Sequence, residues 1–199
     1  MDRKPVSVKS YANIAIVKYW GKADAERMIP STSSISLTLE NMYTETKLSF
    51  LPEDATGDVM YIDDELQGEK ETTKASKVLD LFRTNPNQHV KIETCNNMPT
   101  AAGLSSSSSG LSALVKAANE LFQVGKTQSE LAQIAKFASG SSSRSFFGPL
   151  SAWDKDSGEV YQVETDLKLA MIMLVLTDQK KPVSSRDGMK LCTETSTSF

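Results

Sequence analysis

Hydrophobic and polar positions alternate along the first third of the chain in the manner of β-strands. The segments 6–15, 33–39, 44–50 and 59–62 are rich in Val, Ile, Thr and Tyr, and Pro, Gly, Asp and Asn residues separate them. β-Branched and aromatic side chains favour a pleated, half-buried backbone, whereas the separating residues favour turns. The pattern therefore predicts four β-strands in this third.

The spacing of the apolar residues changes between residues 70 and 83. The apolar residues there at helical spacing are Ala75, Val78, Leu79 and Phe82. Because most of the other positions are polar, this stripe is typical of an amphipathic helix that packs on a core. Residues 90–94 alternate again as a strand, and residues 96–99 are predicted to turn.

Two more helices are predicted after residue 104. The first begins in the serines at 105, packs through the face Leu111, Leu114, Val115, Ala118 and Phe122, and ends before Gly125. The second begins at Thr127, because Thr127 and Glu130 have the spacing of a capping box, and extends to residue 138.

The last fifty residues return to strand patterns. Residues 150–163 are predicted to form a hairpin with its turn at 155–158. The run 169–176 contains eight consecutive apolar residues and is predicted to be a fully buried strand, and a helix is predicted after Ser184. The whole pattern predicts an α+β fold.

Composition and charge exclude several classes of protein. The chain has 199 residues, 39% of them hydrophobic, and a formal net charge of −3, which is ordinary for a globular domain and does not favour binding to nucleic acid. A bilayer span needs about 20 apolar residues, so the eight-residue run predicts no membrane partner. The polar N-terminus resembles neither a secretory signal nor an anchor, and we expect a cytoplasmic protein.

Cysteine and histidine are too few for several kinds of chemistry. Cys95 and Cys192 are far apart in sequence, so the spacing predicts neither a disulfide framework nor a metal site. His89 is the only histidine, and a G-x-S-x-G motif is absent. A serine hydrolase is therefore a weak alternative, because it needs His89 as its base beside one of the serine clusters.

Serine is unusually frequent, with 26 residues in two main clusters at 105–109 and 139–145. A low-complexity linker is one interpretation of such clusters. We reject it because each cluster lies at a junction between predicted secondary-structure elements rather than between domains. Both clusters are therefore candidates for binding sites.

The segment 99–108 has the features of a phosphate-binding turn. Gly103 permits close approach of the backbone, the serines supply hydroxyl groups, and the helix that follows presents free N–H groups to an anion. The segment matches neither the P-loop nor the G-x-G-x-x-G pattern. A serine-rich helix cap without a ligand is the alternative.

Three other segments carry groups that suit anions. Segment 11–22 combines lysines, aromatic residues and a glycine at a predicted strand end, although a solvated strand end with aromatic packing is the simpler interpretation. Segment 139–145 combines hydroxyl groups, Gly140 and the Arg144 guanidinium, as in a phosphate or carboxylate clamp. Segment 180–189 repeats this chemistry at a predicted helix start.

Together these segments resemble the mevalonate diphosphate decarboxylase family, part of the superfamily of galactokinase, homoserine kinase and mevalonate kinase. The resemblance is carried by YANIAIVKYWGK (11–22), NNMPTAAGLSSSSSG (96–110), ASGSSSRS (138–145) and SSRDGM (184–189). The P-x-x-x-G-L-x-S-S-S core is shared by the superfamily and marks the ATP phosphates. KYWGK and SGSSSR are specific to the decarboxylases.

The resemblance implies a fold, a reaction and cofactors. Residues 1–182 would form the N-terminal kinase-superfamily domain, which is similar to domain 2 of ribosomal protein S5, and residues 183–199 would begin a ferredoxin-like C-terminal domain. The family uses ATP and Mg2+ to decarboxylate mevalonate 5-diphosphate to isopentenyl diphosphate in isoprenoid biosynthesis. ATP phosphorylates the tertiary hydroxyl group, because hydroxide is a poor leaving group.

The resemblance also implies roles for individual residues. Asn13, Lys22 and Ser185 would be catalytic, with Asn13 beside the reacting hydroxyl and Ser185 near the transferring phosphoryl group. The substrate-binding residues would be Tyr19, Lys22, Ser139, Gly140, Ser141 and Arg186 toward the diphosphate, with Arg144 on the carboxylate. Gly103, Leu104, Ser105, Ser106, Ser107 and Ser108 would bind ATP, and Ser106 would lie nearest Mg2+.

One departure from the family pattern concerns the general base. The family is longer and has its catalytic aspartate in an Asp-Ala-Gly-Pro-Asn-like segment of the C-terminal domain, and no such segment occurs in these 199 residues. We therefore expect an N-terminal portion that does not turn over by itself, from a full-length protein that is a homodimer. The alternative is a non-catalytic module that binds nucleotide or diphosphate.

Overall fold

The computed structural model describes residues 4–24, 26–98, 106–172, 183 and 185–196, with only the backbone described at Ser106, Ser185, Arg186, Lys190 and Thr193. The strands are β1 (Val6–Val17), β2 (Lys22–Asp24), β3 (Ile29–Pro30), β4 (Ser34–Phe50), β5 (Val59–Ile62), β6 (Glu65–Leu66), β7 (Val90–Asn96), β8 (Leu150–Trp153) and β9 (Val160–Val163). The helices are α1 (Glu69–Leu79), α2 (Ser106–Leu121), α3 (Gln128–Ala138), the 3-10 helix η1 (Ser142–Phe146) and α4 (Ser185–Thr195).

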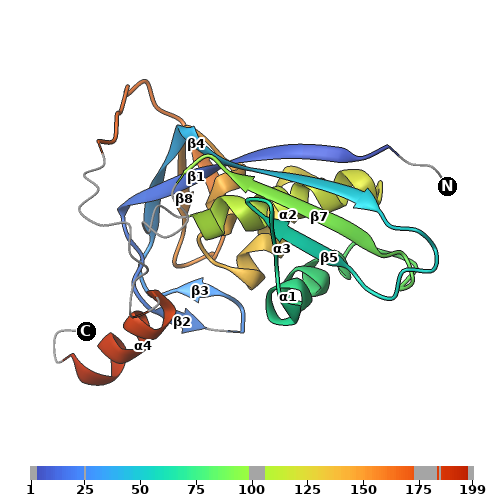
Figure 1. The fold of residues 1–199 in the computed structure, drawn as a ribbon. Helices are drawn as coiled ribbons and strands as arrows, with labels where there is room; N and C mark the ends of the chain where they lie inside the picture. The colour runs from blue at the N-terminus through green and yellow to red at the C-terminus, as the bar shows by residue number, and fades with distance from the viewer. Residues whose placement is uncertain (1–3, 25, 99–105, 173–182, 184, 197–199) are drawn as a thin grey trace.

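One mixed sheet forms the centre of the fold. Its strand order is β6-β5-β7-β4-β8-β9, with β1 also paired to β4, and β5 and β7 are the parallel pair. Figure 1 shows α1, α2 and α3 packed together against this sheet. Leu48, Val90 and Ile92 from the strands are fully buried against apolar residues of the three helices, which form the main core. The predicted α+β class is confirmed.

The two strands predicted at 33–39 and 44–50 are one continuous strand, β4. Tyr11 of β1 pairs with Tyr43, but the next residue, Ala12, pairs with Leu39, so residues 40–42 bulge out of the ladder. The polar residues that predicted a turn are instead accommodated in this irregularity, since an unpaired residue in a bulge does not need strand-forming character. The bulge bends β4 so that its two halves pair with β7 and β8.

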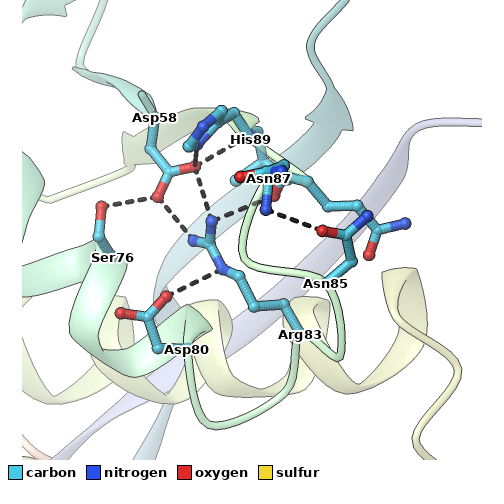
Figure 2. A network of polar contacts seen from close by, with 9 residues as sticks. Asp58, Ser76, Asp80, Arg83, Asn85, Asn87 and His89 are labelled. Carbon is cyan, nitrogen blue, oxygen red and sulfur yellow. Dashed lines mark hydrogen bonds and ion pairs between the residues drawn. The ribbon is translucent and has the colours of Figure 1, made fainter. Parts of the chain in front are cut away.

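The helix predicted at 70–83 ends earlier, at Leu79. After it the chain turns, Phe82 stays buried, and Arg83 points to the carboxylate of Asp58, with Arg83 Nη2 and Asp58 Oδ2 2.6 Å apart (Figure 2). Asp58 also accepts hydrogen bonds from Ser76 Oγ and from the Val90 backbone N–H. The Arg83 backbone N–H still donates to the Leu79 carbonyl oxygen, so the chain continues as a turn that places Arg83 against Asp58.

The other two predicted helices agree closely with the structure. α2 ends at Leu121, and Gln123 (φ 57°) takes the left-handed conformation before Gly125 (φ 75°) does so, so the helix ends slightly earlier than Gly125 alone would predict. The capping box is confirmed: Glu130 N–H donates to Thr127 Oγ1, and Thr127 N–H donates to the Glu130 carboxylate.

The hairpin at 150–163 is confirmed as β8 and β9, with a turn that includes Gly158 (φ 70°). The buried strand predicted at 169–176 is wrong for residues 169–172, which form no strand and are exposed, and its remainder lies outside the described residues. An apolar run is buried only when another part of the protein packs against it, and none of the described residues covers residues 169–172. Residues 185–195 form the helix α4, as predicted.

Candidate anion-binding site

Arg144 is a buried cation at the centre of the second serine cluster. Its side chain comes from η1, and the residue is 3% exposed. Its Nη1 donates a hydrogen bond to Ser34 Oγ of β4, and its Cζ lies 5.5 Å from the centroid of the Tyr19 ring. Nε has no hydrogen-bond partner, and none of the ion pairs in the described part of the chain includes Arg144.

Burial changes the protonation chemistry of this group. Desolvation lowers the pKa of Arg144 to about 10, although the electrostatic influence of Tyr19 opposes that change. A guanidinium removed from water without a carboxylate is costly unless an anion compensates it. The site is therefore organised to accept an anionic group.

Asn13 on β1 contributes an unpaired acceptor. Its Nδ2 donates to the Ser141 carbonyl oxygen at 3.0 Å and to Ser145 Oγ at 2.8 Å. A carbonyl oxygen can only accept, so this contact fixes which end of the amide is the NH2 group. Asn13 Oδ1 is left buried without a partner, ready to accept a hydrogen bond from a ligand hydroxyl.

The loop before η1 owes its shape to close packing at Gly140. A Cβ atom on Gly140 would lie 2.8 Å and 2.9 Å from two ring carbons of Trp153 and 3.3 Å from the Tyr19 hydroxyl. The carbonyl of Gly140 accepts from Ser143 Oγ, and the Oγ atoms of Ser139 and Ser141 lie 3.3 Å apart. The glycine lets the Trp153 ring and the Tyr19 hydroxyl lie close to the backbone of this loop.

Buried polar atoms without partners gather around this loop. Of eight such atoms in the described residues, six belong to Asn13, Ser36, Ser142, Arg144, Ser151 and Trp153. They come from β1, β4, η1 and β8, and Ser36 is directly opposite Ser151 in the β4–β8 ladder. Buried polar groups are normally satisfied, so such a concentration indicates a place where a ligand or water supplies the missing partners.

The structure brings together one subset of the predicted residues. Asn13, Tyr19, Ser139, Gly140, Ser141 and Arg144 lie in one connected group. Lys22 lies exposed on β2, with its Nζ 3.2 Å from Met28 Sδ. The sequence did not predict Ser34, which accepts a hydrogen bond from Arg144, or Trp153, whose ring packs against Gly140. The only sequence signal is the alternation of Ser34 and Ser36 on β4, and this pattern does not show which distant loop the two serines contact.

Several predicted residues cannot be placed in this group. Gly103, Leu104 and Ser105 lie outside the described residues, as do the side chains of Ser106, Ser185 and Arg186. Ser107 is exposed and Ser108 is buried in the first turn of α2, whose start in the serine cluster agrees with the prediction. The roles assigned to all these residues stay predictions.

The hydrolase alternative loses its support. His89 lies in the Asp58 network, with its Nδ1 3.7 Å from Asp58 Oδ1 (Figure 2), and not beside a serine cluster. Within the described ranges no three His, Cys, Asp or Glu side chains group as a metal site would require. None of the described helices is both long and apolar enough to cross a membrane.

Comparisons with solved structures show the class to which this fold belongs. Mevalonate pyrophosphate decarboxylase from Streptococcus pyogenes is 67% identical, with a TM-score of 0.93 over 100% of this chain and 63% of that one. A structure described as MDDEF in complex with MVAPP, AMPPCP and magnesium is 36% identical, with a TM-score of 0.79 over 98% of this chain and 62% of that one.

Sequence comparisons identify the family itself. The diphosphomevalonate decarboxylase of Saccharomyces cerevisiae is 36% identical over 216 residues, which cover 97% of this chain and 54% of that protein. Residues 10–163 match the family described as the diphosphomevalonate decarboxylase-like N-terminal domain, and the chain belongs to this family. The resemblance seen in the sequence is confirmed. The chain spans about half the length of the curated relatives that it matches.

Proposed function

We propose that this chain provides the substrate-binding and nucleotide-binding part of an ATP-dependent diphosphomevalonate decarboxylase. The observation that carries the proposal is the buried Arg144 guanidinium, which has no carboxylate partner among the described residues. Such a group needs an anion, and a planar carboxylate matches its fork of donors. The family relationship and the complex of a relative with MVAPP agree with a carboxylate- and diphosphate-bearing substrate.

The proposed reaction makes use of the groups around Arg144. The substrate carries a tertiary hydroxyl group β to its carboxylate, and MgATP would supply the phosphoryl group that makes this oxygen a leaving group. The bond between the carboxylate and the α-carbon then breaks, its electron pair forms the α–β double bond, and phosphate departs with CO2. Arg144 would hold the carboxylate, and Asn13 Oδ1 would accept a hydrogen bond from the hydroxyl group.

The diphosphate would lie against the hydroxyl groups next to Gly140. Ser139, Ser141 and Tyr19 surround this part of the loop, and we assign them to the diphosphate together with Lys22 and Arg186. Side-chain hydroxyls and backbone N–H groups bind phosphate oxygens well when bulky side chains do not prevent close approach. Gly140 provides that access.

The start of α2 fits the phosphates of a nucleotide. Backbone N–H groups in the first turn of a helix lack helical partners, and the exposed Ser107 lies in that turn. The serine hydroxyls are also oxygen donors of the kind that Mg2+ prefers. We therefore assign ATP and Mg2+ to the segment 103–108, with Ser185 beside the phosphoryl group.

A second function is favoured by the composition of the residues that surround Asn13 and Arg144. Its members are cationic, amide, hydroxyl and aromatic side chains, and no described carboxylate or imidazole contacts Asn13 or Arg144 to take a proton from the substrate hydroxyl. The chain by itself would then act as a binding module for diphosphate or nucleotide. For the full-length protein we propose a cytoplasmic homodimer, as the family resemblance implies.

Calorimetry with mevalonate 5-diphosphate tests the binding proposal. We expect the chain to bind this ligand, and Arg144→Lys to weaken binding at least about tenfold, because an ammonium does not replace a bidentate guanidinium. The matched control is Arg27→Lys, an exposed arginine, which should bind like the parent. Equal affinity of Arg144→Lys and the parent would remove Arg144 from the site. ATP-dependent release of CO2 by the same protein would decide between the enzyme and the binding module.

A further inference from the structure

Lys116 of α2 is a half-buried cation that contacts η1, the element that carries Arg144, and it has no role in the proposed chemistry. Its Nζ donates to Ser10 Oγ of β1 and to the Ser145 carbonyl oxygen of η1, each at 3.2 Å. The same Nζ lies over the Phe146 ring, 4.7 Å from its centroid. All these partners are neutral, and η1, whose conformation positions Arg144, supplies two of them.

The contacts of Lys116 continue to Asn13 through Ser145. Ser145 uses its carbonyl oxygen for Lys116 and its hydroxyl for Asn13 Nδ2 at 2.8 Å. Asn13 Nδ2 also donates to the Ser141 carbonyl. Ser145 therefore links the Lys116 ammonium to the side-chain amide of Asn13, whose Oδ1 has no partner.

The same network reaches the serine-rich start of α2. Ser10 Oγ lies 2.7 Å from Ser112 Oγ, which donates to the carbonyl oxygens of Ser108 and Ser109. Ser10, Ser112, Ser108 and Ser109 are all fully buried. Lys116 thus lies where β1, α2 and η1 meet, between the two serine clusters.

We propose that Lys116 is a positioning residue for the substrate site, which holds η1 and the Asn13 amide in their binding geometry and adds positive charge behind the anion. The proposal rests on the proposed function, because it assumes that an anion binds at Arg144. A network of this kind is stable only if each member is satisfied, so removing the ammonium leaves the Ser145 carbonyl with only the longer hydrogen bond from Ser10 Oγ, at 3.4 Å, and loosens η1. Charge in a partly desolvated place also acts on a nearby anion more strongly than it would in water.

A pH dependence should follow from the surroundings of Lys116. Burial lowers the pKa of Lys116 to about 8, and no charged group among the described residues contributes to this change. The groups that face its amine are Ser10 from β1 and the Ser145 carbonyl and Phe146 ring from η1, and none of them titrates near pH 8. Arg144, the nearby cation of η1, loses its proton at a higher pH than Lys116 does.

The test measures binding of mevalonate 5-diphosphate by calorimetry at pH 7.0 and 9.0. We expect Lys116→Met to weaken binding about tenfold at pH 7.0, within the usual range of coupling between two groups. Lys77→Met, an exposed lysine of α1, is the matched control and should bind like the parent. Raising the pH should weaken binding by the parent and the control several-fold more than binding by Lys116→Met. The control also corrects for titration of the ligand itself.

Lys116→Arg separates charge from simple packing. Its guanidinium keeps the charge and the donors but does not titrate near pH 8, so it should restore affinity and lose the extra pH dependence. Binding by Lys116→Met within twofold of the parent, with the same pH dependence, would overturn the proposal. Absence of binding by the parent would instead overturn the proposed function, so the two failures are distinguishable.

A measurement on the unaltered chain covers the case in which the variants fail to fold. Lysine labelled with 13C at the ε-carbon reports the titration of Lys116 by NMR. If protonated Lys116 favours the anion, the anion must equally favour protonated Lys116. Saturating mevalonate 5-diphosphate should therefore raise the pKa of Lys116, and an unchanged titration would overturn the proposal.

Discussion

The Arg144 guanidinium lies over the ring of Tyr19, with 5.5 Å between Cζ and the ring centroid. Tyr19 in turn packs edge-on to Trp153, with ring centroids 4.8 Å apart. An aromatic face is an attractive surface for a cation, and the attraction grows when both groups are desolvated. The stack therefore holds Arg144 in place without using its N–H groups, of which one Nη1 proton is bound by Ser34 Oγ.

Tyr19→Leu should weaken the packing that keeps Arg144 in position. It removes the aromatic face together with the hydroxyl group that we assign to the diphosphate, and the desolvated cation–π contact alone contributes up to about 2 kcal/mol. Because 1.4 kcal/mol corresponds to tenfold in affinity, we expect about tenfold weaker binding of mevalonate 5-diphosphate by calorimetry. Tyr161→Leu, on β9 and half-exposed, should bind like the parent. Unaltered affinity in Tyr19→Leu would contradict a positioning role for the stack.

Gly140→Ala should distort the same loop. The new methyl group would lie within 3 Å of the Trp153 ring, which is fully buried and cannot move aside. Overpacking of this kind typically costs about 1–3 kcal/mol, so the free energy of unfolding should fall by that amount in a urea titration. Gly57→Ala is the control, since nothing lies within 4 Å of its added methyl group. If both variants unfold at the same urea concentration, the close packing at Gly140 is not what shapes the loop.

Local patterns were sufficient to predict most of the fold. The capping box of Thr127 and Glu130, the apolar face of α2 and the alternation in β1 each depend on residues close in sequence, and each agrees with the structure. The errors have non-local causes. The bulge at 40–42 lies in the pairing with β1, and the turn after α1 brings Arg83 to Asp58, which is distant in sequence.

The candidate site was predictable only in part, for the same reason. The serine cluster at 139–145 and the segment 11–22 could be singled out by their residue types. Nothing in those residues shows that Ser34 accepts from Arg144, or that Trp153 packs on Gly140. These contacts arise because β4 and β8 pair in one register, which places Ser34 directly opposite Trp153.

The segment after β9 should bind hydrophobic dyes. Leu167 and Leu169 are 69% and 45% exposed, and with Leu37, Leu39 and Leu150 they help line a cavity of about 480 Å³. Met171 and Ile172 of the same segment are also exposed, and exposed apolar side chains promote association, so we expect dye fluorescence and self-association of this chain. The double variant Leu167→Asn with Leu169→Asn should reduce both. Leu66→Asn, at an isolated exposed leucine of β6, should not, and an equal effect of this control would show that the cavity is not the dye site.

The Asp58 network should control the acid stability of the chain. The carboxylate is 3% exposed and receives Arg83, Ser76 Oγ and the Val90 amide (Figure 2). Burial acts to raise the pKa of Asp58, but the hydrogen bonds from these groups outweigh it, and the pKa lies below its ordinary value. A carboxyl group with a lowered folded-state pKa stabilises the fold above its unfolded pKa of about 3.9, and this stability is lost as the pH falls through the folded pKa.

Asp58→Asn removes that charge and leaves the buried Arg83 with Asp80, whose side chain is 59% exposed, as its remaining ion-pair partner. Breaking one side of a buried ion pair costs about 3–5 kcal/mol, so the free energy of unfolding at pH 7 should fall by roughly that amount in urea titrations. Between pH 5 and pH 3 the parent should lose more stability than Asp58→Asn, because the variant has no carboxylate to protonate at this site. Asp54→Asn, at an exposed position of the same loop, should follow the parent at every pH. Parallel stability curves for the parent and Asp58→Asn below pH 5 would show that protonation of Asp58 is not linked to unfolding, and that other carboxyl groups determine acid stability.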